Sequence, residues 1–261
     1  MQRRTGDSSK KNVSKKSDWD HVASWYHSIV GDAGMEFHRE IIFPGLKLIL
    51  GNIQDKKILD LACGQGAFSR FLHRTGAEVT GIDLAPSLIE QAKKMGPKEI
   101  DYFCMDACDL NLSTSFDDVV SILAIQNIPD HIALMNSIQR VTKKGSRMIW
   151  VILHPCFRIP RQSSWGYEDT RKIQFRRIDR YMSPLDIPIQ MHPGSNPEIE
   201  TKTYHRPLSY YAKLLTKNNW YITDIEEWCS HKKSEPGKKA KTENRAREEF
   251  PVFLAIVASR F

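Results

Sequence analysis

Residues 57–66 run Lys57-Ile58-Leu59-Asp60-Leu61-Ala62-Cys63-Gly64-Gln65-Gly66, a short apolar segment followed at once by two closely spaced glycines. The apolar part is typical of a buried strand, and residues 67–74 after it have helical character. Glycines between a strand and a helix permit a tight turn and let a ligand approach the backbone at the helix N-terminus. This part of the chain therefore predicts a strand, a glycine turn and a helix.

The alternation of strand and helix then repeats along the chain. Further apolar segments that are typical of buried strands occupy residues 78–82, 100–104, 116–124 and 147–153. Helical patterns fall at residues 86–95 and 130–141. A helix over residues 207–218 and strands over 220–228 and 252–258 follow later. Because continuously apolar strands alternate with helices, the sequence predicts an α/β fold with a parallel sheet covered on both faces.

Three other segments complete the predicted organisation. Residues 1–17 are polar and basic, which predicts a disordered tail. Residues 18–50 carry aromatic and apolar side chains at helical spacing, which predicts an N-terminal helical cap. Residues 155–205 break the alternation over about fifty residues, too long for a structureless loop, so they are expected to form short elements and to cover the substrate.

Length and composition limit the class of protein. A chain of 261 residues has room for one sizeable core, so a single domain over residues 18–261 is expected. No run of about 18 apolar residues predicts a membrane span, and the polar N-terminus lacks the apolar part of a secretory signal. A cytoplasmic protein is therefore expected. The net charge of +7 favours an anionic partner without selecting one.

The cysteines and histidines predict neither a disulfide framework nor a metal site. The five cysteines include no C-x-x-C pair, and the histidines include no pair spaced as metal ligands on a helix.

Two acidic residues follow predicted strands of the sheet. Asp83 ends the second strand, nineteen residues after Gly64, and Asp106 follows the third. The ligand crevice of an open parallel sheet lies beyond the carboxyl ends of its strands, where strand order reverses. There a carboxylate can accept hydrogen bonds from the hydroxyls of a ribose, and another can accept from the exocyclic amine of an adenine. The sequence therefore predicts a nucleoside-containing ligand at this edge.

The glycine motif Leu59-Asp60-Leu61-Ala62-Cys63-Gly64-Gln65-Gly66 and the acidic motif Gly81-Ile82-Asp83-Leu84-Ala85 resemble those of class I methyltransferases, in particular the group called methyltransferase type 11. The resemblance covers about residues 57–155 well. It implies a Rossmann-like, seven-stranded, mostly parallel sheet with helices on both faces and an antiparallel last strand. It also implies S-adenosyl-L-methionine as the cofactor. Ala62 stands where the family usually has glycine.

The resemblance also implies roles for individual residues. Asp60 and the backbone of residues 62–66 would surround the methionine part of the cofactor, Asp83 the ribose, and Asp106 the adenine. Residues 123–127 would lie near the sulfonium, and Tyr26 or Trp25 would cover the cofactor, a core role being equally open for either aromatic. The implied cofactor-binding residues are Tyr26, Asp60, Ala62, Cys63, Gly64, Gly66, Asp83, Leu84, Asp106, Ala107, Ala124 and Gln126.

NAD binding is a competing interpretation of the same topology. The loop lacks the G-x-G-x-x-G spacing, since the glycine after Gly66 is Gly76. The late elements also do not form a second nucleotide-binding half. The motifs therefore favour S-adenosylmethionine.

Methyl transfer from a sulfonium needs alignment of the reactants and does not always need a base. The candidates for contact with the acceptor are His154, at the end of the fifth strand, and the pair Tyr204 and His205, with a structural role open for each. The segment 155–205 mixes aromatics with arginines, which suits an anionic or planar small molecule and equally suits nucleic acid. No Asn-Pro-Pro-Tyr-type sequence follows the fourth strand, so a small-molecule acceptor is favoured. An RNA or protein acceptor and a non-catalytic cofactor-binding protein remain alternatives.

Overall fold

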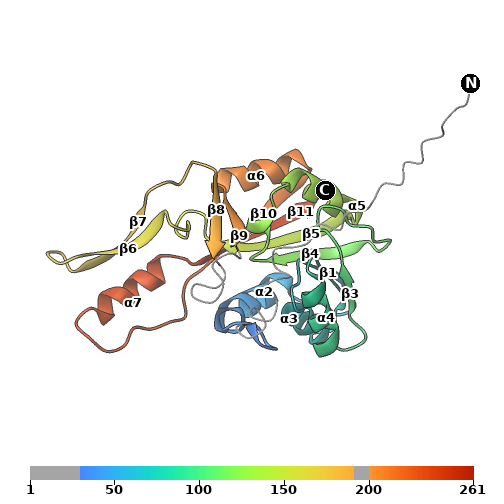
Figure 1. Cartoon of the computed structure of the whole chain (residues 1–261), viewed down its shortest axis with the longest axis horizontal. Helices are drawn as coiled ribbons and strands as arrows, with labels where there is room; N and C mark the ends of the chain where they lie inside the picture. The colour runs from blue at the N-terminus through green and yellow to red at the C-terminus, as the bar shows by residue number, and fades with distance from the viewer. Residues whose placement is uncertain (1–29, 191–199) are drawn as a thin grey trace, which may run out of the picture.

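The computed structural model describes residues 30–190 and 200–261 (Figure 1). The predicted tail over residues 1–17 and the predicted aromatics Trp25 and Tyr26 lie outside the described residues.

A seven-stranded sheet in the order β10-β11-β5-β4-β1-β2-β3 forms the centre of the fold. The pairs β1–β2, β2–β3, β1–β4 and β4–β5 are parallel, and β11 runs antiparallel to both of its neighbours. This confirms the predicted Rossmann-like, mostly parallel sheet with an antiparallel last strand. The strands are β1 (Lys57–Leu61), β2 (Glu78–Asp83), β3 (Asp101–Cys104), β4 (Phe116–Ile122), β5 (Thr142–Leu153), β10 (Trp220–Trp228) and β11 (Phe253–Arg260).

Helices cover both faces of this sheet, as the alternating pattern predicted. Figure 1 shows α5 and α6 on one side and α2, α3 and α4 on the other. In β5, Trp150 packs in the core under α5 and α6, whereas its neighbours Ile149 and Val151 pack in the core under α2, α3 and α4. Successive side chains of a strand point to opposite faces, so an all-apolar strand serves both cores. The helices are α2 (Phe43–Leu50), α3 (Ala67–Arg74), α4 (Pro86–Met95), α5 (His131–Arg140), α6 (Leu208–Lys217) and α7 (Ala240–Glu249), with a π-helical turn η2 (His38–Ile42) before α2 and a 3-10 turn η3 (Ile125–Asn127) after β4.

The irregular segment after β5 contains short strands of its own, as its length predicted. β6 (Ser163–Glu168) pairs antiparallel with β7 (Ile173–Ile178), and β8 (Leu185–Gln190) pairs antiparallel with β9 (Glu200–His205). Neither pair joins the main sheet. The β6–β7 hairpin extends away from the sheet beside α7, a helix that the charged pattern between the last two strands had not predicted (Figure 1).

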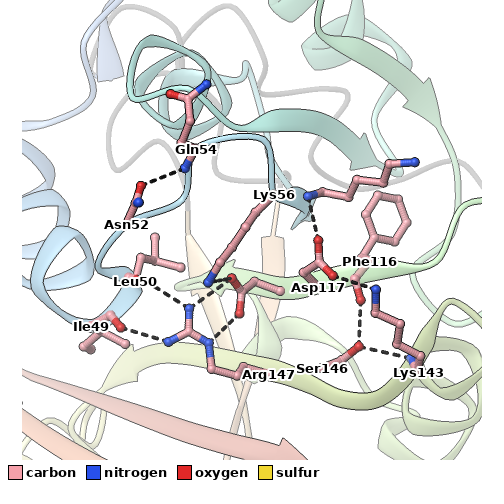
Figure 2. Close-up of polar contacts among 12 residues, drawn as sticks. Ile49, Leu50, Asn52, Gln54, Lys56, Phe116, Asp117, Lys143, Ser146 and Arg147 are labelled. Carbon is pink, nitrogen blue, oxygen red and sulfur yellow. Dashed lines mark hydrogen bonds and ion pairs between the residues drawn. The ribbon is translucent and has the colours of Figure 1, made fainter.

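Arg147 of β5 ties the end of α2 to the sheet (Figure 2). Its guanidinium donates to the backbone carbonyls of Ile49 (3.0 Å) and Leu50 (3.2 Å). It also forms a bidentate pair with the carboxylate of Asp118, at 2.6 and 3.0 Å, and that carboxylate is buried. One side chain thus pairs a buried charge and satisfies two carbonyls at a helix C-terminus.

No helix among residues 30–190 and 200–261 has both the length and the apolar character needed to cross a membrane.

Candidate functional site

A cavity of about 310 Å³ lies at the carboxyl ends of the parallel strands. Its walls come from the residues that follow β1, β2, β3 and β4. Strand order reverses at β1, which pairs with β2 on one side and β4 on the other, so the cavity sits where an open parallel sheet binds its ligand. The predicted site residues that line it are Ala62, Gly64, Asp83, Leu84, Asp106, Ala107 and Ala124.

The turn after β1 has the backbone geometry that its glycines suggested. Gly64 and Gly66 adopt left-handed φ angles of 55° and 74°, and Gly66 caps the N-terminus of α3. A Cβ on Gly66 would meet the hydroxyl of Tyr102, so a larger residue there would have to displace that ring. Ala62 also has a left-handed φ, 59°, which places a strained alanine where the resembled family usually has glycine.

Asp83 is held against this turn. Its carboxylate accepts hydrogen bonds from the backbone N–H groups of Gly64 and Ala85, both at 2.9 Å. Burial raises its pKa, and the two N–H donors oppose that shift. A carboxylate has about four acceptor positions, so Asp83 keeps capacity for donors in the cavity that it lines.

Asp60 lies behind the turn, in a recess of about 40 Å³. The recess shares His38 and Ala62 with the large cavity and is also lined by Cys63. Asp60 accepts a hydrogen bond from the Ser69 hydroxyl at 2.6 Å, and burial raises its pKa to about 7. The same burial raises the pKa of the Cys63 thiol.

Gly66 and Gln126 do not line the large cavity. Gln126 faces a small pocket of about 20 Å³ beside β9, with Tyr204 and His205. Its buried Oε1 has no hydrogen-bond partner among the described residues.

Asp106 lines the cavity from the turn that follows β3. Its Oδ1 accepts from the backbone N–H of Cys108 at 2.8 Å, which fixes the side chain.

The N-terminal segment adds cavity residues that the sequence had not singled out. Met35, Phe37 and His38 line the large cavity. His38 is buried, which lowers its pKa to about 4, and its Nδ1 accepts from the backbone N–H of Met35 at 3.1 Å. A neutral ring that accepts at Nδ1 carries its proton on Nε2, so His38 is a donor. The aromatic pattern of residues 18–50 predicted helices but gave no sign of which side chains face a ligand.

His154 does not line the large cavity, although its position at the end of β5 predicted that it would face the crevice. Its ring is buried, and its Nδ1 accepts from the backbone N–H of Cys156 at 3.2 Å. The ring proton therefore lies on Nε2, 2.6 Å from Oε1 of Glu227. Burial lowers the pKa of the ring more than Glu227 raises it. Both ring nitrogens of a neutral His154 therefore form hydrogen bonds within the protein, one with Glu227 of β10 and one with the turn that follows β5.

Tyr204 and His205 lie beside η3, next to the loop that lines the large cavity, but do not line that cavity themselves. The Nε2 of His205 lies 2.7 Å from the backbone carbonyl of Tyr181, to which it donates. The ring of Tyr204 stacks with the guanidinium of Arg206, 5.5 Å away. Their predicted contact with the acceptor stays a prediction.

Comparison with known proteins shows what the residues around this site are similar to. Residues 59–150 match the family described as methyltransferase domain. A ubiquinone biosynthesis O-methyltransferase from Xanthomonas oryzae pv. oryzae is 34% identical over 97 residues, which cover 35% of this chain and 41% of that protein. The biotin biosynthesis bifunctional protein BioHC from Cellvibrio japonicus is 28% identical over 149 residues, 57% of this chain and 29% of that protein. The match thus spans about two fifths of the length of the ubiquinone relative.

Solved structures extend the similarity to most of the chain. An S-adenosylmethionine-dependent methyltransferase from Mesorhizobium loti is 26% identical, with a TM-score of 0.66 over 84% of this chain and 97% of that one. A structure from Listeria monocytogenes, described as a putative methyltransferase of the same kind, has the same fold, with 24% identity and a TM-score of 0.64 over 84% of this chain and 97% of that one. Residues 59–150 thus match a methyltransferase domain, and the fold over most of the chain is similar to that of S-adenosylmethionine-dependent methyltransferases.

Proposed function

We propose that the protein binds S-adenosylmethionine in the large cavity and transfers its methyl group to a small-molecule acceptor by in-line displacement. The observation that carries the proposal is the cavity itself, where the glycine turn, Asp83 and Asp106 meet at the reversal of strand order. Its volume of about 310 Å³ lies within the range of small-molecule sites.

The donor set of the cavity fits this cofactor. Asp83 would accept from the ribose hydroxyls, Asp106 beside Ala107 would accept from the adenine amine, and the apolar walls would contact the rings. Asp60 in the adjoining recess is a carboxyl group whose ionised form a nearby ammonium would stabilise. The turn around the methionine part would be shaped by Cys63, Gly64 and Gly66. The cofactor would also be contacted by Leu84 and Ala124. The proposal keeps the predicted cofactor-binding roles of Gln126 and Tyr26.

The bound cofactor supplies an activated methyl group and a neutral leaving group, so the protein has to position the reactants and exclude water. His38 would serve as a hydrogen-bond donor at the cavity wall, because its low pKa keeps it neutral and its Nδ1 is already engaged.

The small-molecule class of acceptor is supported by the names of relatives. The matching segments belong to proteins of ubiquinone and biotin biosynthesis, whose products are small molecules. An RNA or protein acceptor is the alternative, and the segment 155–205 contains arginines and aromatics that both kinds of acceptor use.

Methyl-labelled S-adenosylmethionine distinguishes these alternatives. The protein is incubated with the labelled cofactor and with separate metabolite, RNA and protein fractions. We expect label in the metabolite fraction. Label confined to RNA or protein would establish the other acceptor class, and bound cofactor without transfer to any fraction would favour a binding protein.

The site assignment is tested with an Asp83→Asn variant. Loss of a charged acceptor should weaken binding of S-adenosylhomocysteine by about tenfold or more, since hydrogen bonds to charged groups contribute about 1.5–3 kcal/mol. Asp109→Asn is the matched control, because the Asp109 side chain is 88% exposed, outside the cavity. Equal affinity of the two variants would overturn the role of Asp83.

A further inference from the structure

A second cavity, of about 290 Å³, lies beside the proposed cofactor cavity. One wall is formed by residues that follow β10 and residues that lead into β11, and the β6–β7 hairpin forms another. The start of β11 pairs with the end of β5, Phe253 opposite Leu153, so this cavity lies at the same edge of the sheet as the first. Phe37 lines both cavities, so the two adjoin each other at this side chain.

The charge of the second cavity is one-sided. Four cationic side chains line it, namely Arg158, Arg176, Lys232 and Arg247, and no acidic side chain is among the described residues that do. Lys232 pairs with Glu36 at 3.1 Å. None of the three arginines forms an ion pair with a described residue, since Arg247 donates only to Ser234 and Asn244.

Arg158 is the least satisfied of these groups. Its guanidinium makes no hydrogen bond or ion pair with the rest of the described chain, and burial lowers its pKa. Arg176 lies close enough that the charge of Arg158 lowers its pKa in addition to burial. Two like charges that are partly withdrawn from water without a counter-ion are unfavourable, and a bound anion would offset that cost.

Arg176, by contrast, is held in place. Its Nε donates to the carbonyl of Phe157 at 2.8 Å and its terminal nitrogen to the Ser163 hydroxyl at 2.7 Å. Its guanidinium also lies 5.1 Å from the centre of the Trp165 ring. The cationic end of the cavity is therefore preorganised by the hairpin, which lowers the cost of binding.

The remainder of the cavity presents aromatic surface. The ring of Phe250 meets those of Phe157 and Trp165 edge-on, with centroids 5.5 Å apart in both cases. A cavity of about 290 Å³ has room for a small molecule, whereas a single-stranded nucleic acid needs a groove that follows several nucleotides.

We propose that the second cavity binds the methyl acceptor, and that the acceptor is a carboxylate on an aromatic or similarly apolar body, its charge at Arg158 and Arg176 and its body against Trp165 and Phe250. The identification of the ligand as the methyl acceptor rests on the proposed methyltransferase function. Binding of a carboxylate in this cavity does not require the cofactor.

The test is a calorimetric titration of the full chain, without cofactor, with three carboxylates and their neutral amides: benzoate, 1-naphthoate and indole-3-acetate. At least one carboxylate should bind about tenfold tighter than its amide, because only the carboxylate forms an ion pair with a guanidinium and accepts two parallel hydrogen bonds from it. Arg158→Gln should remove this preference. Arg177→Gln is the matched control, since Arg177 adjoins Arg176 in β7 but its side chain is 67% exposed and pairs with Asp179.

Each outcome decides the proposal separately from the methyltransferase function. Absence of any preference for a carboxylate over its amide, or a preference that is unchanged in Arg158→Gln, overturns the proposal. Displacement of a bound carboxylate by a single-stranded RNA oligonucleotide, in a way that depends on Arg158, overturns it as well. Thermal unfolding checks that Arg158→Gln is folded, and removal of an unpaired, partly buried charge should not lower its midpoint. S-adenosylhomocysteine binding, titrated in parallel, reports the proposed function alone.

Discussion

Asp60 and Asp83 are carboxylates on neighbouring strands, but the chain holds them differently. Asp83 accepts from two backbone N–H groups, which stabilise its ionised form, whereas Asp60 is fully enclosed and accepts from the Ser69 hydroxyl. Burial dominates at Asp60, and the nearby charge of Asp83 adds to it. The carboxyl of Asp60 is therefore the group of the site most readily protonated near neutral pH.

This difference predicts how stability depends on pH. The pKa of Asp60 rises from 3.8 to about 7 on folding, so the folded state binds the extra proton between these values. The stabilisation from that proton is complete below the lower pKa and is lost as pH rises through the higher one. Asp60→Asn does not titrate and keeps an oxygen for Ser69. Its free energy of unfolding relative to the wild type should therefore rise from pH 4 to 7, by at most about 1.4 kcal/mol per pH unit.

Urea unfolding of both proteins across this range, without cofactor, measures the difference. Parallel pH profiles would show that Asp60 is ionised throughout or that its burial is incomplete.

The position of His154 in the sequence suggested contact with the acceptor, whereas its hydrogen bonds in the fold indicate a structural role. It bridges the turn after β5 and Glu227 of β10 through both ring nitrogens. We expect His154→Ala to lower the free energy of unfolding by about 1–3 kcal/mol, through lost packing and hydrogen bonds, with the affinity for S-adenosylhomocysteine unchanged. His231→Ala, which removes an exposed contact with Glu36, should have a smaller effect.

Thermal unfolding and calorimetry on the same samples make this comparison. A His154→Ala protein of unchanged stability with reduced methyl transfer would instead return the histidine to the acceptor site.

At the scale of elements, the structure is held together by contacts between segments far apart in the chain. The end of α2 reaches β4 and β5 through Arg147, whose partners Ile49 and Leu50 lie almost a hundred residues away. A local pattern of apolar residues predicted α2 as a helix and β5 as a strand. That pattern contained no signal that an arginine in β5 would donate hydrogen bonds to the carbonyls at the end of that helix.

Removal of Arg147 should be costly for that reason. Arg147→Met leaves the buried carboxylate of Asp118 with Lys56 at 3.8 Å as its remaining ionic partner among the described residues. Breaking a buried pair typically costs about 3–5 kcal/mol. Lys143→Met is the control, since the side chain of Lys143 is 59% exposed and its pair with Asp117 should contribute less than about 1 kcal/mol.

Chemical denaturation of the two variants tests this account of Arg147. Equal losses of stability would mean that the Asp118 carboxylate is hydrated when Arg147 is absent. Adding Asp118→Asn to the Arg147→Met protein should recover part of the loss, because it removes the unpaired charge.

For the whole molecule, the two cavities lie along one edge of the sheet and differ in how far the sequence predicted them. The wall formed by residues after β1, β2 and β3 follows short motifs, so the order and spacing of these motifs singled out Gly64, Asp83 and Asp106, which line the large cavity. His38 and Phe37 enter from a segment whose pattern marked only helices. The second cavity gathers residues from three distant segments, around Phe37, Arg158 to Arg176, and Lys232 to Phe253. Strand motifs reveal chemistry that depends on local order, whereas a site assembled by long-range packing becomes visible only in the fold.

The central claim is that the large cavity binds S-adenosylmethionine, and calorimetric titration with S-adenosylmethionine, S-adenosylhomocysteine and NAD, after removal of any carried-over ligand, tests it most directly. Both sulfur compounds should bind with a stoichiometry of one per chain, and S-adenosylhomocysteine at a hundred times its dissociation constant should stabilise the fold by about 2.7 kcal/mol. NAD should not bind. Binding of NAD in their place, or no binding of either sulfur compound to the folded protein, would contradict the assignment of the cavity.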